Sequence, residues 1–372
     1  MTSEPIRPIS ADSHIVEPPN CFVDFIDPAY RERAPRIIDH PESGGDKFLI
    51  EGLPRPIGLN TLAAAGKNPE EIRMEGDRFS ALHRGGWDPK ARLADQDRDG
   101  VAAEFIYPSI GMLICNAKDA DYKNACMNAY NRWLQTYVGE APDRLYGLGQ
   151  TAVRSVPEAI ADFEKIKEMG FKGVMMPGYP ATEQDYHDPI FDPLWKASVE
   201  LDLPISFHIL TMGGQTMGGW DARGPKIGGF QSIIRGCQDI IGMFIYGGVF
   251  ERNPDLKLVC VEADAGWAPH YVYRMDHAYK RHRFWNNAQE LARMPSEYFF
   301  ENVYLTFQDD WAAFRSVDML NHKRLLWASD FPHSDSTWPR SQEVLAEQTK
   351  NLTPEQKSSI LRDNVRELYK LN

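Results

Sequence analysis

The stretch "ISADSHIVEPP", residues 9–19, is a short apolar run that carries an acid and a histidine and then ends at two prolines. Asp12 and His14 are two residues apart, so in an extended strand their side chains leave the same face. The pattern has two interpretations, a polar strand terminus or half of a metal site.

Seven further runs of the same kind follow along the chain. Most are nearly continuous in apolar residues rather than alternating, which is typical of strands buried on both faces of a parallel sheet. The eight runs are residues 8–14, 101–109, 145–153, 171–178, 203–210, 256–264, 302–310 and 324–333.

Helical patterns lie between these runs. The segment "SVPEAIADFEKIKEMG" has Ser155 and Glu158 at capping-box spacing and stops at Gly170. Near the end of the chain, Thr353 and Pro354 mark the start of another helix. Eight strands alternating with helices predict an α/β fold, a (β/α)₈ TIM barrel, with residues 1–372 as a single domain.

Two segments exceed a minimal barrel. Residues 36–90 carry many glycines, prolines and charged residues, and predict a long insertion after strand 1. Residues 211–230 are dense in glycine and follow strand 5, which predicts a glycine-rich lid.

The composition excludes several classes of function. A net charge of −12 argues against nucleic-acid binding and against docking on anionic membranes. No apolar run approaches the ~20 residues of a membrane span, and the first ten residues lack the apolar core of a secretory signal. Five scattered cysteines without CxxC pairing predict buried free thiols in a reducing compartment, and hence a cytoplasmic protein.

Metal-binding residue types gather where the predicted strands end, which is where the active site of such a barrel lies. Buried acids are costly unless they are paired or bind a cation, so a metal is the simplest reason for this set. In chain order the set comprises Asp12, His14, Glu17, His208, Glu262, His270, Asp309, Asp310, Asp330 and His333.

Four motifs, "DSHIVEPP", "PISFH", "VEADAGWAPHYVYRMD" and "LLWASDFPHSDSTWP", resemble the amidohydrolase-related family of the amidohydrolase superfamily. This is the group around aminocarboxymuconate-semialdehyde decarboxylase and the dihydroxybenzoate decarboxylases. The resemblance implies a barrel with a divalent metal, and by position the ligands would be Asp12, His14, His208 and Asp330. The family commonly has a catalytic histidine at the end of strand 6, where this sequence has Glu262.

The departure at Glu262 motivates the first functional hypothesis. Some superfamily members hold a dinuclear iron or iron/manganese centre and hydroxylate a small carboxylic or amino acid with O₂. We therefore predict such a monooxygenase, with Fe or Mn favoured over Zn and Arg223 of the lid binding the substrate carboxylate. The predicted metal ligands are Asp12, His14, His208, Glu262, His270, Asp330 and His333.

Some of these residues also have other predicted roles. Glu262, His270 and His333 are predicted to be catalytic, and Glu17, Asp309 and Asp310 to support the ligands. For His270 a polar position in the first turn of a helix is an equal alternative, and for His333 a supporting contact to a ligand.

Two further hypotheses stand beside the oxygenase. In the first, one Zn or Mn ion serves a hydrolase or a non-oxidative decarboxylase of a carboxylate substrate, with Glu262 as the general base. In the second, the chain is a non-catalytic barrel subunit. The segment 274–285, "RMDHAYKRHRFW", has a mix of residues common at interfaces. A homodimer, or a hetero-oligomer with a related barrel chain, is expected.

Overall fold

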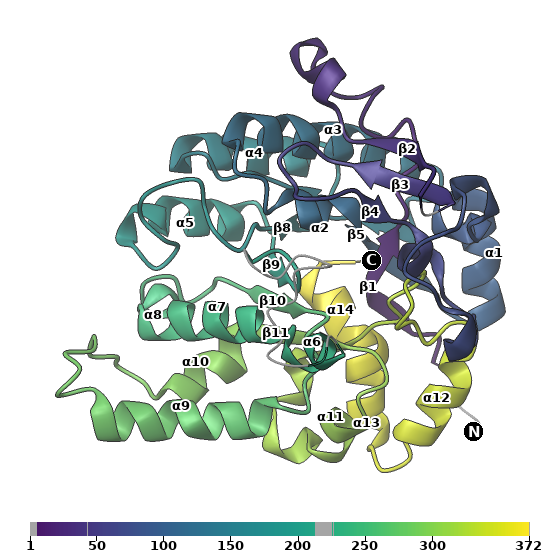
Figure 1. Cartoon of the computed structure of the whole chain (residues 1–372). Coiled ribbons are helices and arrows are strands. Elements are labelled where there is room, and N and C mark those ends of the chain that lie inside the picture. The colour runs from purple at the N-terminus through teal and green to yellow at the C-terminus, as the bar shows by residue number, and fades with distance from the viewer. Residues whose placement is uncertain (1–5, 43, 213–224, 226, 372) are drawn as a thin grey trace.

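The computed structural model describes residues 6–42, 44–212, 225 and 227–371. Parallel strands occupy the middle of the molecule, and helices such as α3, α4, α5, α7 and α9 lie outside them (Figure 1). This is the alternating α/β architecture that the sequence predicts.

Each of the eight predicted strand regions contains a strand. The neighbouring strands are parallel throughout. They are β1 (Ile9–Ile15), β5 (Ala103–Pro108), β6 (Leu145–Gly147) with β7 (Gly149–Gln150), β8 (Val174–Met175), β9 (Ile205–His208), β10 (Leu258–Val261), β11 (Val303–Phe307) and β12 (Leu325–Trp327).

These strands form two sheets, ordered β1-β5-β6 and β12-β11-β10-β9-β8-β7, rather than one continuous ring. At one seam only Leu148 separates β6 from β7. At the other seam the backbone N–H of Asp330 donates to the carbonyl of Asp12 at 3.0 Å, and that of His14 donates to Phe331 at 2.7 Å. The strand order is therefore that of the predicted barrel, with an interruption in the sheet at each seam.

The helices begin where the sequence signals place them. The hydroxyl of Ser155 accepts from the backbone N–H of Glu158 at the start of α4, and Thr353 caps α13. The helices are α1 (Pro89–Asp99), α2 (Ile110–Ile114), α3 (Ala120–Val138), α4 (Val156–Glu168), α5 (Asp192–Glu200), α6 (Gly228–Ser232), α7 (Arg235–Tyr246), α8 (Val249–Arg252), α9 (Ala268–His282), α10 (Pro295–Asn302), α11 (Trp311–Arg315), α12 (Ser341–Gln348), α13 (Pro354–Ser358) and α14 (Asn364–Leu368).

The segment predicted as an insertion, residues 36–90, contains a small antiparallel sheet. Its strands are β2 (Arg36–His40), β3 (Gly45–Leu49) and β4 (Ile57–Gly58), which pair in sequence order. Most of the predicted lid, residues 213–224 and 226, lies outside the described residues.

All five cysteines are buried and free, as predicted. None of the helices in the described ranges combines the length and the apolar character needed to cross a membrane.

Arg92 of α1 fixes the ends of β1 and β12 to each other. Its buried guanidinium donates to the carbonyl oxygens of His14 at 2.6 Å and Phe331 at 3.2 Å, and its Nε pairs with Glu104 at 2.6 Å. Gln96 and Ser13 also donate to this carboxylate. One buried cation therefore holds the two segments that carry most of the candidate site.

Replacing Arg92 by Met should lower the free energy of unfolding by roughly 3–5 kcal/mol, because Glu104 would keep a buried charge without its cation. The double variant Arg92→Met/Glu104→Gln should recover a large part of this loss. Urea denaturation of both variants and of the wild type measures the effect. Equal losses in the single and double variants would contradict the assigned role of the ion pair.

Candidate metal centre

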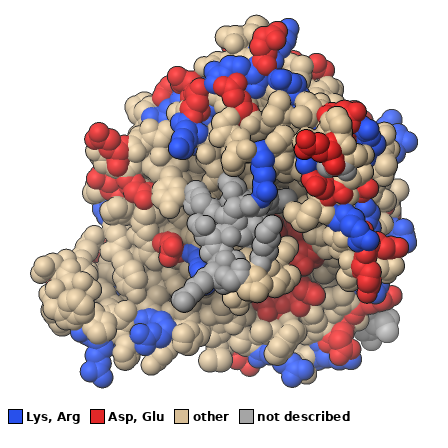
Figure 2. Space-filling model, in the orientation of Figure 1, with Lys and Arg blue, Asp and Glu red and all other residues tan. Residues whose placement is uncertain are grey.

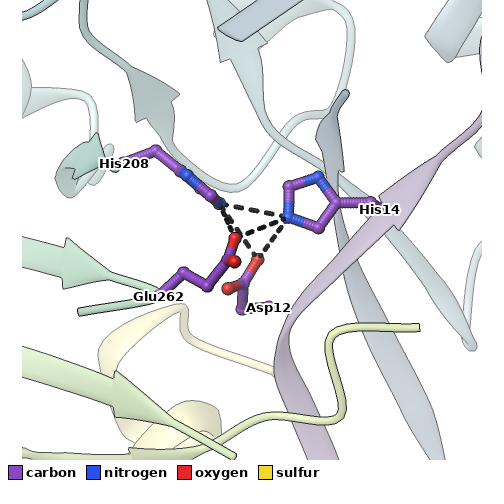
Figure 3. A group of neighbouring side chains, drawn as sticks. All are labelled: Asp12, His14, His208 and Glu262. Atoms are coloured by element: carbon purple, nitrogen blue, oxygen red, sulfur yellow. Dashed lines mark hydrogen bonds and ion pairs between the residues drawn. The ribbon is translucent and has the colours of Figure 1, made fainter. Parts of the chain in front are cut away.

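Four side chains converge at the C-terminal ends of three strands (Figure 3). Asp12 and His14 come from β1, His208 ends β9, and Glu262 directly follows β10. One potential ligand atom from each of the four lies within 4.8 Å of the others. The alternation along β1 thus places its acid and its histidine on one face, as the sequence predicts.

The Nε2 atoms of His14 and His208 are 3.1 Å apart. Asp12 Oδ1 lies 3.4 Å from the first of these atoms and 3.6 Å from the second. Glu262 Oε2 lies 3.5 and 3.4 Å from the same two atoms. Four acceptor-type atoms therefore surround one small volume.

The tautomers of the two imidazoles follow from their other contacts. Nδ1 of His14 lies 3.0 Å from the carbonyl oxygen of Pro108, and Nδ1 of His208 lies 3.1 Å from that of Ile209. A carbonyl oxygen only accepts, so each Nδ1 carries the proton, and Nε2 of a neutral ring is left with a lone pair. Both lone pairs then point at the same place.

A metal ion fits this arrangement. Two nitrogen ligands about 2.1 Å from one ion lie roughly 3.0 to 3.4 Å apart at bond angles of roughly 90 to 110°. The Nε2 separation of 3.1 Å falls in that range. A hydrogen bond from each ring to a backbone carbonyl is also the usual way in which a ligand histidine is oriented.

A second group of donors overlaps the first. It contains His14, Glu262, Asp330 and His333. Asp330 Oδ1 lies 3.5 Å from His14 Nε2 and 3.3 Å from His333 Nδ1. Because His14 Nε2 has a single lone pair, it can bind only one ion at a time. The dinuclear centre stays a prediction.

The carboxylates of this site are buried without hydrogen bonds. Both side-chain oxygens of Asp12 and Asp330, and Oε2 of Glu262, have no hydrogen-bond partner among the described residues. Burial, together with the neighbouring acids, raises the pKa of Glu262 and of Asp330 well above the usual range. Burial lowers the pKa of His14 well below that of a free imidazole. Unpaired buried acids are costly, and a bound cation removes that cost.

The backbone is strained at two of these acids. Glu262 and Asp330 both have φ of 55°, in the left-handed region that residues other than glycine rarely adopt. Such strain persists only where the surrounding structure imposes it, and it is common at functional sites. The turn after each strand thus aims a carboxylate at the imidazoles.

Two of the predicted supporting acids make structural contacts. Oε1 of Glu17 accepts the backbone N–H groups of Ser109, Ile110 and Gly111 at 2.9–3.2 Å. The Asp310 carboxylate accepts from the N–H groups of residues 265 and 266 and caps α11, which fixes the loop after Glu262.

Two predicted site residues, His270 and Asp309, are not brought to this group. His270 is exposed near the start of α9, with its ring 6.3 Å from that of Tyr273, because the helix turns it outward. Asp309 is exposed and contributes only its backbone carbonyl, to Gln348. Arg223 lies outside the described residues.

Three residues near the centre were not predicted from the sequence: Arg92, Ser109 and Asp335. Ser109 closes the second apolar run and bonds His333, so the strand-end rule itself could have found it. Asp335 lines the cavity described below, and burial raises its pKa. No sequence signal pointed to Arg92, whose partners are 12 to 239 residues away.

A cavity of about 150 Å³ opens onto the metal-binding side chains. Figure 2 shows acidic side chains gathered in a hollow near the centre of one face. Glu262, Asp330 and His333 line the cavity, together with Gln308 and Asp335. The rest of its described wall is mainly apolar and includes Leu62, Met74, Met112, Ile209, Leu210, Phe230, Ile233 and Ile234.

Residues 53–371 match the model of the amidohydrolase family. The chain belongs to the amidohydrolase family. A curated relative is 2-amino-3-carboxymuconate-6-semialdehyde decarboxylase of Dictyostelium discoideum. It is 24% identical over 274 residues, which cover 70% of this amidohydrolase and 71% of the relative.

Two solved structures show the same fold. An amidohydrolase from Mycobacterium avium subsp. paratuberculosis K-10 is 20% identical, with a TM-score of 0.78 and coverage of 98% of this chain and 99% of that one. The 5-carboxyvanillate decarboxylase of Novosphingobium aromaticivorans DSM 12444, complexed with manganese and 4-hydroxy-3-methoxy-5-nitrobenzoic acid, is 18% identical. Its TM-score is 0.70, with coverage of 99% of this chain and 97% of that one.

These findings identify the chain as an enzyme of a metal-dependent superfamily, and thus do not favour the non-catalytic subunit hypothesis. They also support the non-oxidative alternative better than the predicted O₂-dependent monooxygenase. The prediction of an oxygenase rests on Glu262 and the extra histidines, but histidine and carboxylate ligands serve both chemistries.

Replacing Asp330 by Asn should have opposite effects on two forms of this amidohydrolase. Without metal, the variant should be about 1–3 kcal/mol more stable, because a buried unpaired acid is removed. With Mn²⁺, the wild type should gain more stability than the variant, because it binds the ion more tightly. Thermal unfolding with EDTA and with a Mn²⁺ series measures both effects, and Asp309→Asn serves as the exposed control. A destabilised metal-free variant with a full gain on Mn²⁺ addition would contradict the assignment.

Glu17 predicts a pH dependence of stability. Burial raises its pKa to about 7, so the folded protein keeps a proton that the unfolded chain releases above its ordinary value near 4.5. Stability from this group is therefore present at low pH and is lost as pH rises from about 5 to 7, by at most roughly 3 kcal/mol.

The variant Glu17→Gln should lack this loss, and its stability relative to the wild type should grow between pH 5 and pH 8. Chemical denaturation at several pH values gives the difference, and the exposed substitution Glu164→Gln should leave the wild-type profile in place. A constant difference between Glu17→Gln and the wild type would rule out the assigned proton.

Proposed function

We propose that this chain is a divalent-metal-dependent, non-oxidative decarboxylase of a small carboxylate substrate. The observation that carries the proposal is the convergence of the Nε2 atoms of His14 and His208 with the carboxylates of Asp12 and Asp330, beside a cavity with a partly apolar wall. The decarboxylase names of the relatives, and the manganese in one of them, support the same reaction.

Asp12, His14, His208 and Asp330 are the proposed ligands. All four are fully buried, and their ligand atoms lie within 3.6 Å of His14 Nε2 or His208 Nε2. Nitrogen and oxygen donors without thiolate suit Mn²⁺ as well as Zn²⁺. A bound divalent ion would supply positive charge for the substrate carboxylate and would stabilise negative charge that develops as CO₂ leaves.

The cavity supplies orientation and exclusion of water. No lysine or arginine lines the part of it that the structure describes. The substrate carboxylate would therefore be oriented toward the metal-binding end. Leu62, Met112 and Ile209 are among the side chains that would contact an apolar substrate body and displace water from it.

Glu262 is the proposed proton donor. Its side chain lines the cavity and is 13% exposed, whereas that of Asp330 is fully buried. Burial and the neighbouring acids raise the pKa of Glu262, which favours the protonated form of this carboxyl group in the metal-free protein. In the proposed step the bond to the carboxylate carbon breaks, its electron pair stays on the substrate carbon, and Glu262 delivers its proton to that carbon.

The test is CO₂ release by the Mn²⁺-loaded chain under argon, with 5-carboxyvanillate and related small carboxylates as substrates. One CO₂ per substrate without O₂ is expected, and EDTA or His208→Ala should abolish it. Glu262→Gln should keep the metal, as elemental analysis can show, and lose about 10²–10⁴-fold in kcat. Turnover that requires O₂ would overturn this proposal in favour of the oxygenase.

A further inference from the structure

A buried chain of hydrogen bonds runs behind the metal-binding side chains, from Glu17 through Ser109 to His333. Glu17 Oε1 accepts a hydrogen bond from the backbone N–H of Ser109 at 3.0 Å. The Ser109 hydroxyl donates to the carbonyl of Ile15 at 2.7 Å, and its oxygen also lies 2.7 Å from His333 Nε2. All three residues of this chain are at most 9% exposed.

The direction of each proton in this chain is fixed. The Ile15 carbonyl only accepts, so it takes the single hydroxyl proton of Ser109. The serine oxygen can then only accept from His333, so Nε2 of that ring carries its proton. A neutral His333 is left with its lone pair on Nδ1, which lies 3.3 Å from Asp330 Oδ1 at the cavity.

The ring of His333 is also held on its face. It stacks on His14 with a centroid separation of 3.9 Å and an interplanar angle of 20°. Ser109 therefore sets which edge of the ring points away from the site, and the stack sets the plane. Loss of the serine hydroxyl would free the ring to carry its proton on Nδ1 and donate it to Asp330.

We propose that Ser109 is a positioning residue that holds His333 as the Nε2–H tautomer, so that Nδ1 presents a hydrogen-bond acceptor at the substrate cavity. The contact of Nδ1 with a substrate rests on the proposed function, whereas the tautomer does not.

Histidine-selective ¹⁵N NMR tests the tautomer directly. In protein loaded with diamagnetic Zn²⁺, the long-range ¹H–¹⁵N pattern of His333 should show a protonated Nε2 and an unprotonated Nδ1. The signals are assigned by their loss in His333→Gln. Wild-type protein with the proton on Nδ1 would overturn the proposal, whatever the variants do.

Variants then test the role of Ser109. In Ser109→Ala the His333 pattern should move toward the Nδ1–H form, and Ser109→Thr, which keeps the hydroxyl, should restore the wild-type pattern. Ser198→Ala is the matched control, because it removes another buried serine hydroxyl that donates to a backbone carbonyl, that of Leu203 at 2.6 Å, in α5. An unchanged pattern in Ser109→Ala would refute the positioning role.

Kinetics separate this inference from the proposed function. With carboxylates that bear an adjacent hydroxyl or amino group, Ser109→Ala should have about tenfold lower kcat/KM, the equivalent of one neutral hydrogen bond, with unchanged metal content. Substrates without the donor should lose little. Equal losses on both classes would overturn the role of His333 Nδ1 as a hydrogen-bond acceptor for the substrate. Absence of CO₂ release from any substrate would reject the decarboxylase alone and leave the tautomer result standing.

Discussion

The contact between the lone pairs of His14 and His208 is the constraint on which the rest of the centre depends. Each neutral ring donates its only N–H proton to a backbone carbonyl. The two Nε2 atoms therefore face each other without a proton between them. Buried acids surround them, also without hydrogen-bond donors among the described residues. In the absence of a cation the folded state contains repulsion that it must offset elsewhere. The arrangement thus lowers the stability of the metal-free protein and raises its affinity for a metal ion.

The repulsion at the centre is offset by stabilising contacts of the surrounding elements rather than by the metal ligands themselves. Arg92 donates to the carbonyls of His14 and Phe331. The backbone amides of His14 in β1 and of Asp330 after β12 donate across the seam. Asp310 fixes the loop behind Glu262. Strained backbone at Glu262 and Asp330 can persist because these neighbours determine it from several sides. Precise sites generally need such support.

The sequence predicted the features that depend on local pattern. All eight strand regions, the caps at Ser155 and Thr353, and the convergence of donors at strand ends follow from periodicity and from barrel geometry. The break at Leu148 and the outward turn of His270 depend on exact sheet and helix geometry that no pattern encodes. Arg92 and Ser109 act through partners far away in the chain. The types of the donor residues could not decide between an oxygenase and a decarboxylase, since the same ligands bind the metals of both.

The seam between β1 and β12 has a consequence for biosynthesis. Asp330 and His333 are translated more than 300 residues after Asp12 and His14. A nascent polypeptide that lacks β12 has three of the four proposed ligands, but it lacks Asp330 and the backbone bonds across this seam. Such a product should therefore hold the ion less tightly than the chain that includes β12.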